Sequence, residues 1–246
     1  MRRLVFALIP SLCLAQSAFE VASVKRQAWT GSGSQGVFAR NDTLRAEHVS
    51  LNDLVLYAYH LRPEQLSGGP AWADRTGLKL DEAELYQVTA KAAGSPSQET
   101  FREMLRQLLA ERFQLKVRRT EKDLPLYELT LGRNAPKLKP SQKPEHVAMS
   151  SPGLNGVRIS ATGITIARLV QLLSVYVDHP LADKTGLTGA FDIEMEFLPP
   201  TAPPDAAGDA PSLAAALRDR LGLKLEKTTG PVETIVIEHA ERPAEN

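Results

Sequence analysis

Cysteine is nearly absent from this chain, because its 246 residues include one, Cys13. Disulfide-stapled scaffolds need pairs of cysteines, so that class of small secreted protein is excluded. An excess of charge of either sign is also lacking, with 29 Lys and Arg against 29 Asp and Glu. Proteins that bind a phosphate backbone carry a basic footprint. We therefore expect no nucleic-acid partner.

Long apolar runs are missing too. The main one, at residues 4–15, is interrupted by Pro10 and Ser11, and a membrane-spanning helix needs about 20 apolar residues. A basic start at residues 2–3 precedes this run, and small residues follow it up to Ala18. This layout is typical of a secretory signal peptide. We expect residues 1–18 to be removed and the mature protein to be exported, periplasmic or extracellular, with no membrane span.

Cys13 lies inside this segment. Lipidation of Cys13 is an alternative fate, but Leu12 precedes it where lipoprotein signals carry Gly, Ala or Ser. Cleavage after Ala18 or Ala15 removes Cys13 and leaves a mature chain without cysteine. Thiol catalysis and cysteine-ligated metals are then excluded.

Helical spacing of apolar residues occurs in four segments. They follow Ser50, Ser97, Thr165 and Ser212, which are residue types that favour the N-cap position. Strand-like alternation fills the intervals at residues 19–24, 44–49, 86–90, 115–119, 126–131, 191–197, 223–225 and 232–237. The order is helix, strand, strand, repeated. We predict an α+β fold in which helices pack on small antiparallel or mixed sheets.

The two halves of the chain are similar in pattern. Residues 105–131 and 217–237 each show a helix end, a Leu-Lys strand, a polar turn with Pro and an apolar strand. We predict two pseudo-repeated halves, each with two helix-strand-strand units, at residues 19–135 and 156–246. A Pro-rich linker is expected at 136–155 and a flexible insert at 198–211.

One polar cluster has the side chains of acid–base chemistry. Asp178 and His179 are followed by Asp183 and, after a turn, by Asp192. His179 with Asp183 forms the candidate catalytic pair for an exported hydrolase with a carboxylate and histidine site near 178–192. A solvated turn beside a strand end is the structural interpretation.

Other motifs lack the context that their chemistry requires. Residues 31–36 match G-x-G-x-x-G, but no helical period follows, so they indicate a Gly/Ser-rich loop. The five histidines show no H-E-x-x-H or close ligand pairing. We therefore expect no cofactor and no metal site.

Three residues are candidates for binding. Trp72 follows a Gly-Gly-Pro turn, and an exposed Trp72 favours recognition, because aromatic residues are enriched at interfaces. Lys184 and Thr185 belong to a Lys-Thr-Gly triplet also found in penicillin-recognising serine enzymes, but no Ser-x-x-Lys nucleophile accompanies it. A tight turn at Gly186 is the structural interpretation.

Several phrases together resemble one family. They are FEVASVKR, LVLYAYHLRPEQLSGGPAW, MLRQLLAERFQLKVRRTEKDLPLYELTL, VDHPLADKTGLTGAFDIEME and LRDRLGLKLEKTTGPVETIVIEHAERPAEN. In combination they are similar to the soil-associated exported protein family of unknown function, over residues 19–246. The resemblance implies export and no assigned catalytic residues. Similar segments also accompany membrane metallopeptidase-type sensor modules, which implies an extracytoplasmic sensing role.

These observations lead to a functional hypothesis. The protein is expected to be a non-catalytic extracytoplasmic recognition or sensing module whose partner is an envelope protein, a peptide or a glycan. The exported hydrolase is the alternative, and an inert envelope structural protein is a third interpretation.

Overall fold

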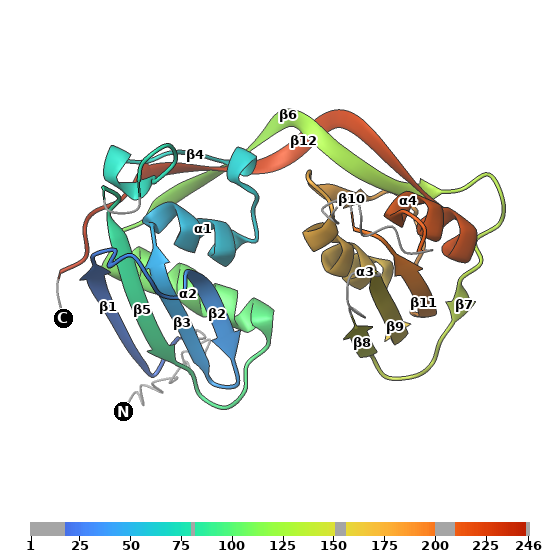
Figure 1. Ribbon diagram of the computed structural model, residues 1–246, viewed down its shortest axis with the longest axis horizontal. Coiled ribbons are helices and arrows are strands. Elements are labelled where there is room, and N and C mark those ends of the chain that lie inside the picture. The colour runs from blue at the N-terminus through green and yellow to red at the C-terminus, as the bar shows by residue number, and fades with distance from the viewer. Residues whose placement is uncertain (1–17, 80–81, 151–155, 200–209, 245–246) are drawn as a thin grey trace, which may run out of the picture. The chain divides into compact units, whose positions relative to one another are not determined.

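The computed structural model describes residues 18–79, 82–150, 156–199 and 210–244. The signal peptide expected up to residue 18, with Cys13, lies outside them except for Ala18, as does most of the expected insert at 198–211. The described residues contain four α-helices and small sheets, and strands predominate (Figure 1). This confirms the α+β class predicted from the sequence.

The chain forms two compact units. Unit 1 contains the described residues up to Thr120 and those from Thr234 onward, whereas unit 2 contains residues 121–233. The chain thus leaves unit 1 at Thr120 and returns to it at Thr234. Two strands, β7 (Lys139–Pro140) and β8 (His146–Ser150), lie within the segment expected to be a linker.

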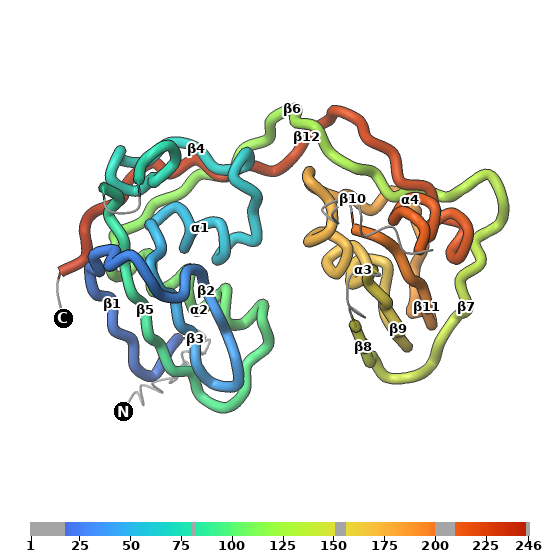
Figure 2. The backbone as a smooth tube through the Cα atoms, viewed as in Figure 1, coloured from blue at the N-terminus to red at the C-terminus, as the bar shows by residue number. Residues whose placement is uncertain are grey.

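Unit 1 is built on a four-stranded antiparallel sheet in the order β1-β5-β3-β2 (Figure 2). Its strands are β1 (Val21–Gln27), β2 (Gly36–Arg40), β3 (Thr43–Val49) and β5 (Leu85–Lys91). β1 and β2, consecutive in sequence, are therefore the two edges of this sheet. The loop between them contains residues 31–35 of the Gly/Ser-rich segment, as expected, and its last residue, Gly36, begins β2.

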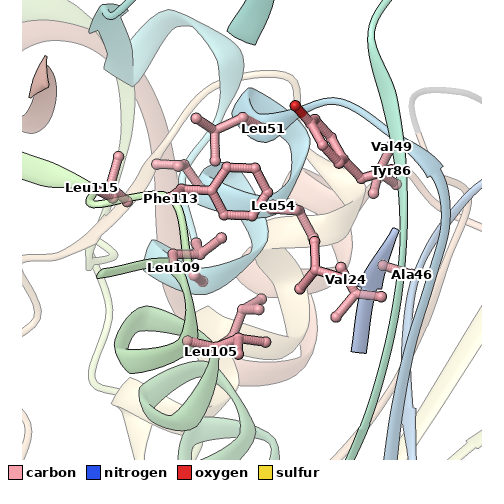
Figure 3. Close-up of a cluster of buried hydrophobic side chains, with 14 of the residues drawn as sticks. Val24, Ala46, Val49, Leu51, Leu54, Tyr86, Leu105, Leu109, Phe113 and Leu115 are labelled. Carbon is pink, nitrogen blue, oxygen red and sulfur yellow. The ribbon is translucent and has the colours of Figure 1, made fainter. Parts of the chain in front are cut away.

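Two helices, α1 (Leu51–Tyr59) and α2 (Gln98–Arg112), pack on one face of this sheet. Val24, Ala46 and Val88 are register neighbours across three strands and are buried in the same cluster as Leu54 and Leu109 of the helices (Figure 3). Side chains alternate between the faces of a strand. The residue before and the residue after each of these three positions on its strand therefore point to the opposite face of the sheet.

Unit 2 has a second four-stranded sheet, in the order β7-β11-β9-β8. It contains β9 (Val157–Ile164) and β11 (Phe191–Phe197), which pair antiparallel. Its core also contains residues of the helix α3 (Ile166–Leu173), the short helix α4 (Leu213–Ala216) and the π-helical turn η4 (Leu217–Leu221), together with Leu129 and Leu223. A short 3₁₀ turn, η3 (Ser174–Tyr176), follows α3.

Two long strands, β6 (Lys116–Leu131) and β12 (Leu223–His239), are hydrogen-bonded neighbours. Short strands pair with them in parallel: β4 (Leu66–Gly68) with residues 235–237, and β10 (Leu181–Asp183) with residues 127–129. Two 3₁₀ turns, η1 (Pro63–Gln65) and η2 (Ala71–Ala73), flank β4.

The polar turns predicted within these two strands are wrong. Residues 120–125 and 226–231 are extended, so each predicted strand pair is one continuous strand. These segments are polar and mostly exposed. An extended segment with little buried surface shows no alternation of apolar residues. Its polar composition is the same as that of a turn, so the sequence pattern does not distinguish the two.

The predicted helix starts are confirmed. Ser50, Ser97, Thr165 and Ser212 are all N-caps, and each side-chain oxygen accepts a bond from the backbone N–H three residues later. At α1 the bond is reciprocal, because the Ser50 N–H donates to the Asp53 carboxylate at 2.8 Å. This arrangement is a capping box.

The backbone of β4 approaches that of β12 closely at Gly68. Its φ is +78°, and a Cβ there would lie 2.6 Å from the carbonyl oxygen of Ile237. Gly77 has the same φ of +78° with nothing within 4 Å of its Cβ position. Gly77→Ala should cost about 1–2 kcal/mol from backbone strain alone. Gly68→Ala should cost about 1–3 kcal/mol more, from overpacking. Urea unfolding measures both, and equal losses would contradict the close approach.

Candidate functional site

The candidate residue His179 lies in a polar cluster of unit 2. Its Nε2 is 3.5 Å from the Oδ2 of Asp178, and its ring centroid is 6.0 Å from that of Tyr127 on β6. The Nζ of Lys227, on β12, is 3.9 Å from the Asp178 carboxylate and 5.9 Å from the centre of the Tyr127 ring. Three segments of the chain therefore bring these four side chains together.

The electrostatics of this cluster centre on Tyr127. Burial raises the pKa of Tyr127, and the hydrogen bond that its hydroxyl donates to Asp178, with the charge of that carboxylate, raises it further. The same hydrogen bond lowers the pKa of Asp178. The imidazole, carboxylate and phenol are groups of the types used in acid–base chemistry.

Asp183, the other half of the expected pair, serves the turn instead. Its Oδ1 accepts bonds from the backbone N–H of Thr185 at 2.9 Å and from the Thr185 hydroxyl at 2.8 Å. The Thr185 oxygen in turn accepts from the N–H of Leu187 at 3.2 Å. Thr185 is buried, and the Lys184 N–H donates to the carbonyl of Leu129. The Lys184 backbone therefore anchors this turn to β6, and Thr185 holds the turn together internally.

Asp192 also has structural partners. Its carboxylate accepts from the Nζ of Lys143 at 3.0 Å and from the backbone N–H of Gly163 at 3.2 Å. Asp183 and Asp192 thus each hold a backbone segment in place. Within the described ranges, no group of three or more His, Cys, Asp or Glu side chains could hold a metal ion.

Trp72 lies in unit 1 at η2, partly buried against the core. The guanidinium of Arg242 lies 5.1 Å from the centre of its ring. Arg242 is held by Glu84, whose two carboxylate oxygens accept from its Nε at 3.1 and 3.0 Å. The Trp72 ring therefore has an internal cation–π partner.

Glu84 itself is a nearly enclosed carboxylate, with a side chain 8% exposed. It also accepts a hydrogen bond from the Tyr86 hydroxyl. Burial raises the pKa of Tyr86 well above its usual value, and the hydrogen bond to Glu84 and the charge of Glu84 add to this effect. The cluster ties the returning segment at Arg242 to β5.

A site that sequence reasoning missed lies on the β2–β3 hairpin of unit 1. Phe38 of β2 and Arg45 of β3 are direct cross-strand partners. They point to the face opposite α1 and α2, because their strand neighbours Val37, Ala39 and Ala46 pack in the core cluster. Phe38 is 53% exposed and is the one aromatic side chain among the exposed large apolar residues of the described ranges.

Two arginines lie on the same face of the sheet as this aromatic ring. Arg40 lies two residues after Phe38 and so shares its face, as does Arg45. Neither arginine takes part in an ion pair within the part of the chain that the structure describes. A surface hollow of about 630 Å³ is lined by residues of the hairpin, including Phe38, Arg40 and Arg45.

The Phe38 ring makes few packing contacts within its own unit. A Cβ at Gly36 would lie 3.5 Å from the tip of the ring, so the ring extends over this bare stretch of β2. Asp42 lines the same hollow, but its ion pair is with Lys91. An exposed ring and two arginines without ion pairs among the described residues form a surface that suits an anionic partner with some apolar area. The signal in the sequence was the alternation in residues 36–40 followed by Asn41-Asp42, a two-residue hairpin loop in which Asn41 has a φ of +56°.

Comparison with known proteins gives one match. The model of the family described as protein of unknown function (DUF3738) matches residues 52–240. No curated protein and no solved structure shows a significant match to the chain. The described residues include no helix with the length and apolar character needed to cross a membrane.

The role of Asp183 is testable by substitution. Asp183→Ala should lower the free energy of unfolding by about 1–3 kcal/mol, because it leaves the polar groups of buried Thr185 without their acceptor. The adjacent exposed Lys184→Ala keeps the backbone bond to Leu129 and should change stability by less than about 0.5 kcal/mol. Thermal and urea unfolding measure both. Unchanged stability of Asp183→Ala would instead favour a role for this residue outside the turn.

The Tyr127 pKa gives a second test in this region. Asp178→Asn removes the negative charge that disfavours the phenolate, so the pKa of Tyr127 should fall toward its usual value of about 10. Burial remains, so the fall should be partial. NMR titration of the tyrosine ring signals measures the pKa, with Asp183→Asn as the control. A pKa that does not move would contradict the contact with Asp178.

Proposed function

The chain belongs to the DUF3738 family, whose description assigns no activity, and we propose that it is a non-catalytic module that binds an acidic segment of another protein. The observation that carries this proposal is the exposed Phe38 beside Arg40 and Arg45 on the uncovered face of the unit 1 sheet. The export expected from residues 1–18 supports a partner outside the cytoplasm. An envelope protein or peptide is then the partner class.

The charge of this face supports an acidic partner. Lys25 and Lys91 point to the same face as Arg45, as the register of β1, β5 and β3 requires. Of these, Lys91 has an ion pair, with Asp42 at 3.5 Å. Glu47 is the one carboxylate on this face of the paired strand positions. The face therefore carries a net positive charge within a chain whose formal charge is zero.

Arginine and phenylalanine contribute differently to such binding. A guanidinium donates paired hydrogen bonds to a carboxylate, and these bonds are stronger than those between neutral groups. An exposed aromatic ring supplies the apolar area that makes a contact resist dissociation. Because isolated surface ion pairs contribute at most about 1 kcal/mol, the ring is needed beside the cations.

The corresponding face of unit 2 has a different character. Glu194 and Glu196 of β11 lie there, and Glu196 is paired with Arg158 at 2.7 Å. We also propose that the two units are repeats of one unit. Their sheet orders, β1-β5-β3-β2 and β7-β11-β9-β8, support this, since elements correspond in chain order. The binding face would then be a specialisation of the first copy.

A peptide titration of the full chain tests this function. The probe is an acetylated, amidated octapeptide of alternating Glu and Val, and its control has Lys in place of Glu. The acidic peptide should bind and the basic one should not, because the face is positive. Arg45→Glu and Phe38→Ser should each weaken binding about tenfold or more, which is about 1.4 kcal/mol. Isothermal titration calorimetry measures the dissociation constants.

Lys116→Glu serves as the matched control for charge. Lys116 is an exposed cation at the start of β6, outside the sheet that presents Phe38. This variant should lose less than twofold in affinity. An equal loss in Lys116→Glu and Arg45→Glu, or equal binding of both peptides, would contradict a site at the hairpin.

A further inference from the structure

The edge of β2 can bind the acidic segment of the proposed partner through backbone hydrogen bonds. This inference rests on the proposed function. We propose that the acidic segment binds as an added β-strand along the free edge of β2, with acidic and apolar side chains alternating. β2 pairs with β3 on one side and is the last strand of its sheet. An exposed edge strand presents backbone groups that a further strand can pair with.

The hairpin register shows which backbone groups face the edge. Arg40 and Thr43 close a two-residue loop, and Phe38 pairs with Arg45 two residues further on. In an antiparallel hairpin these residues bond to the partner strand, so the intervening Val37 and Ala39 direct their N–H and C=O groups outward. The carbonyl of Ala39 indeed accepts a bond from outside the sheet, from the Nε2 of Gln98 at 3.1 Å.

Gln98 therefore occupies the position of an incoming backbone N–H. Its side-chain amide is exposed, and its Oε1 accepts a bond from the Tyr57 hydroxyl at 3.1 Å. Edge strands are commonly protected by Pro, by Lys or by bulges. β2 contains no Pro or Lys and has a regular register with β3. A flexible amide can be displaced by a strand that offers the same bond together with others.

The two faces of β2 set the side-chain pattern of the partner. An added strand lies about 4.8 Å from β2, and its side chains alternate between the faces. On one face they meet Phe38 and Arg40, with Arg45 one strand further in. On the other they lie beside Val37 and Ala39, which pack on the core. Acidic residues suit the first face and apolar residues the second.

Backbone methylation of the probe peptide tests the added strand. Two versions of the Glu-Val octapeptide carry N-methyl groups on all Glu or on all Val residues. A strand on the edge of β2 uses the N–H groups of one of these sets. At least one methylated peptide should therefore bind the full chain ten times more weakly than the unmodified peptide, or worse.

Gln98→Ala provides a second readout. Because the amide competes for the Ala39 carbonyl, its removal should raise the affinity for the unmodified peptide by about two- to fivefold. Gln107→Ala, at a half-buried position of α2 whose amide pairs with Glu111, should leave the affinity unchanged.

The outcomes separate the two proposals. If both methylated peptides bind as well as the unmodified one, the segment lies across the face, so the added strand is overturned and the proposed function stands. If no acidic peptide binds, both fail. If the chain alone forms dimers that Arg45→Glu dissociates in analytical ultracentrifugation, the edge is occupied by a second copy, which also overturns the inference.

Discussion

Unit 1 depends on the return of the chain along β12. Its sheet and helices come from residues before Thr120, but β4, among the described residues, pairs with residues 235–237 alone. The Phe113 carbonyl at the end of α2 accepts from the Glu241 N–H, and Glu84 holds Arg242. These contacts join residues more than a hundred positions apart. Correct closure therefore requires that most of the chain has been made, and local propensity alone cannot provide it.

A second constraint is that both helices of unit 1 cover the same face of its sheet. Apolar residues of α1 and α2 need that face, and the alternation of the strands then leaves the opposite face to polar residues. Lys25, Arg45 and Lys91 satisfy this requirement, whereas Phe38 does not, with 53% of its surface exposed. Folding gains little from an exposed ring, so the ring stays available for the proposed partner.

The sequence predicted best the features that depend on neighbouring residues. All four helix starts follow from a Ser or Thr whose oxygen accepts the N–H three residues later. The continuous strands β6 and β12 were missed, because their central residues are polar and pair with distant residues. For the same reason Arg242 gave no indication that it covers Trp72. The bond from Thr185 to Asp183 is local, and the competing interpretation of Asp183 as part of a catalytic pair drew attention away from it.

Trp72 and Phe38 differ in how far the fold already uses their rings. Trp72 is the larger aromatic and follows a conspicuous turn, yet its ring has the Arg242 guanidinium within 5.1 Å and packs on the core. Phe38 is smaller and lies in an inconspicuous strand, but among the described residues no cation is placed over its ring. A side chain that makes few contacts within the fold is available to contact a partner. By that criterion the hairpin, rather than the tryptophan, is the surface where recognition is to be sought.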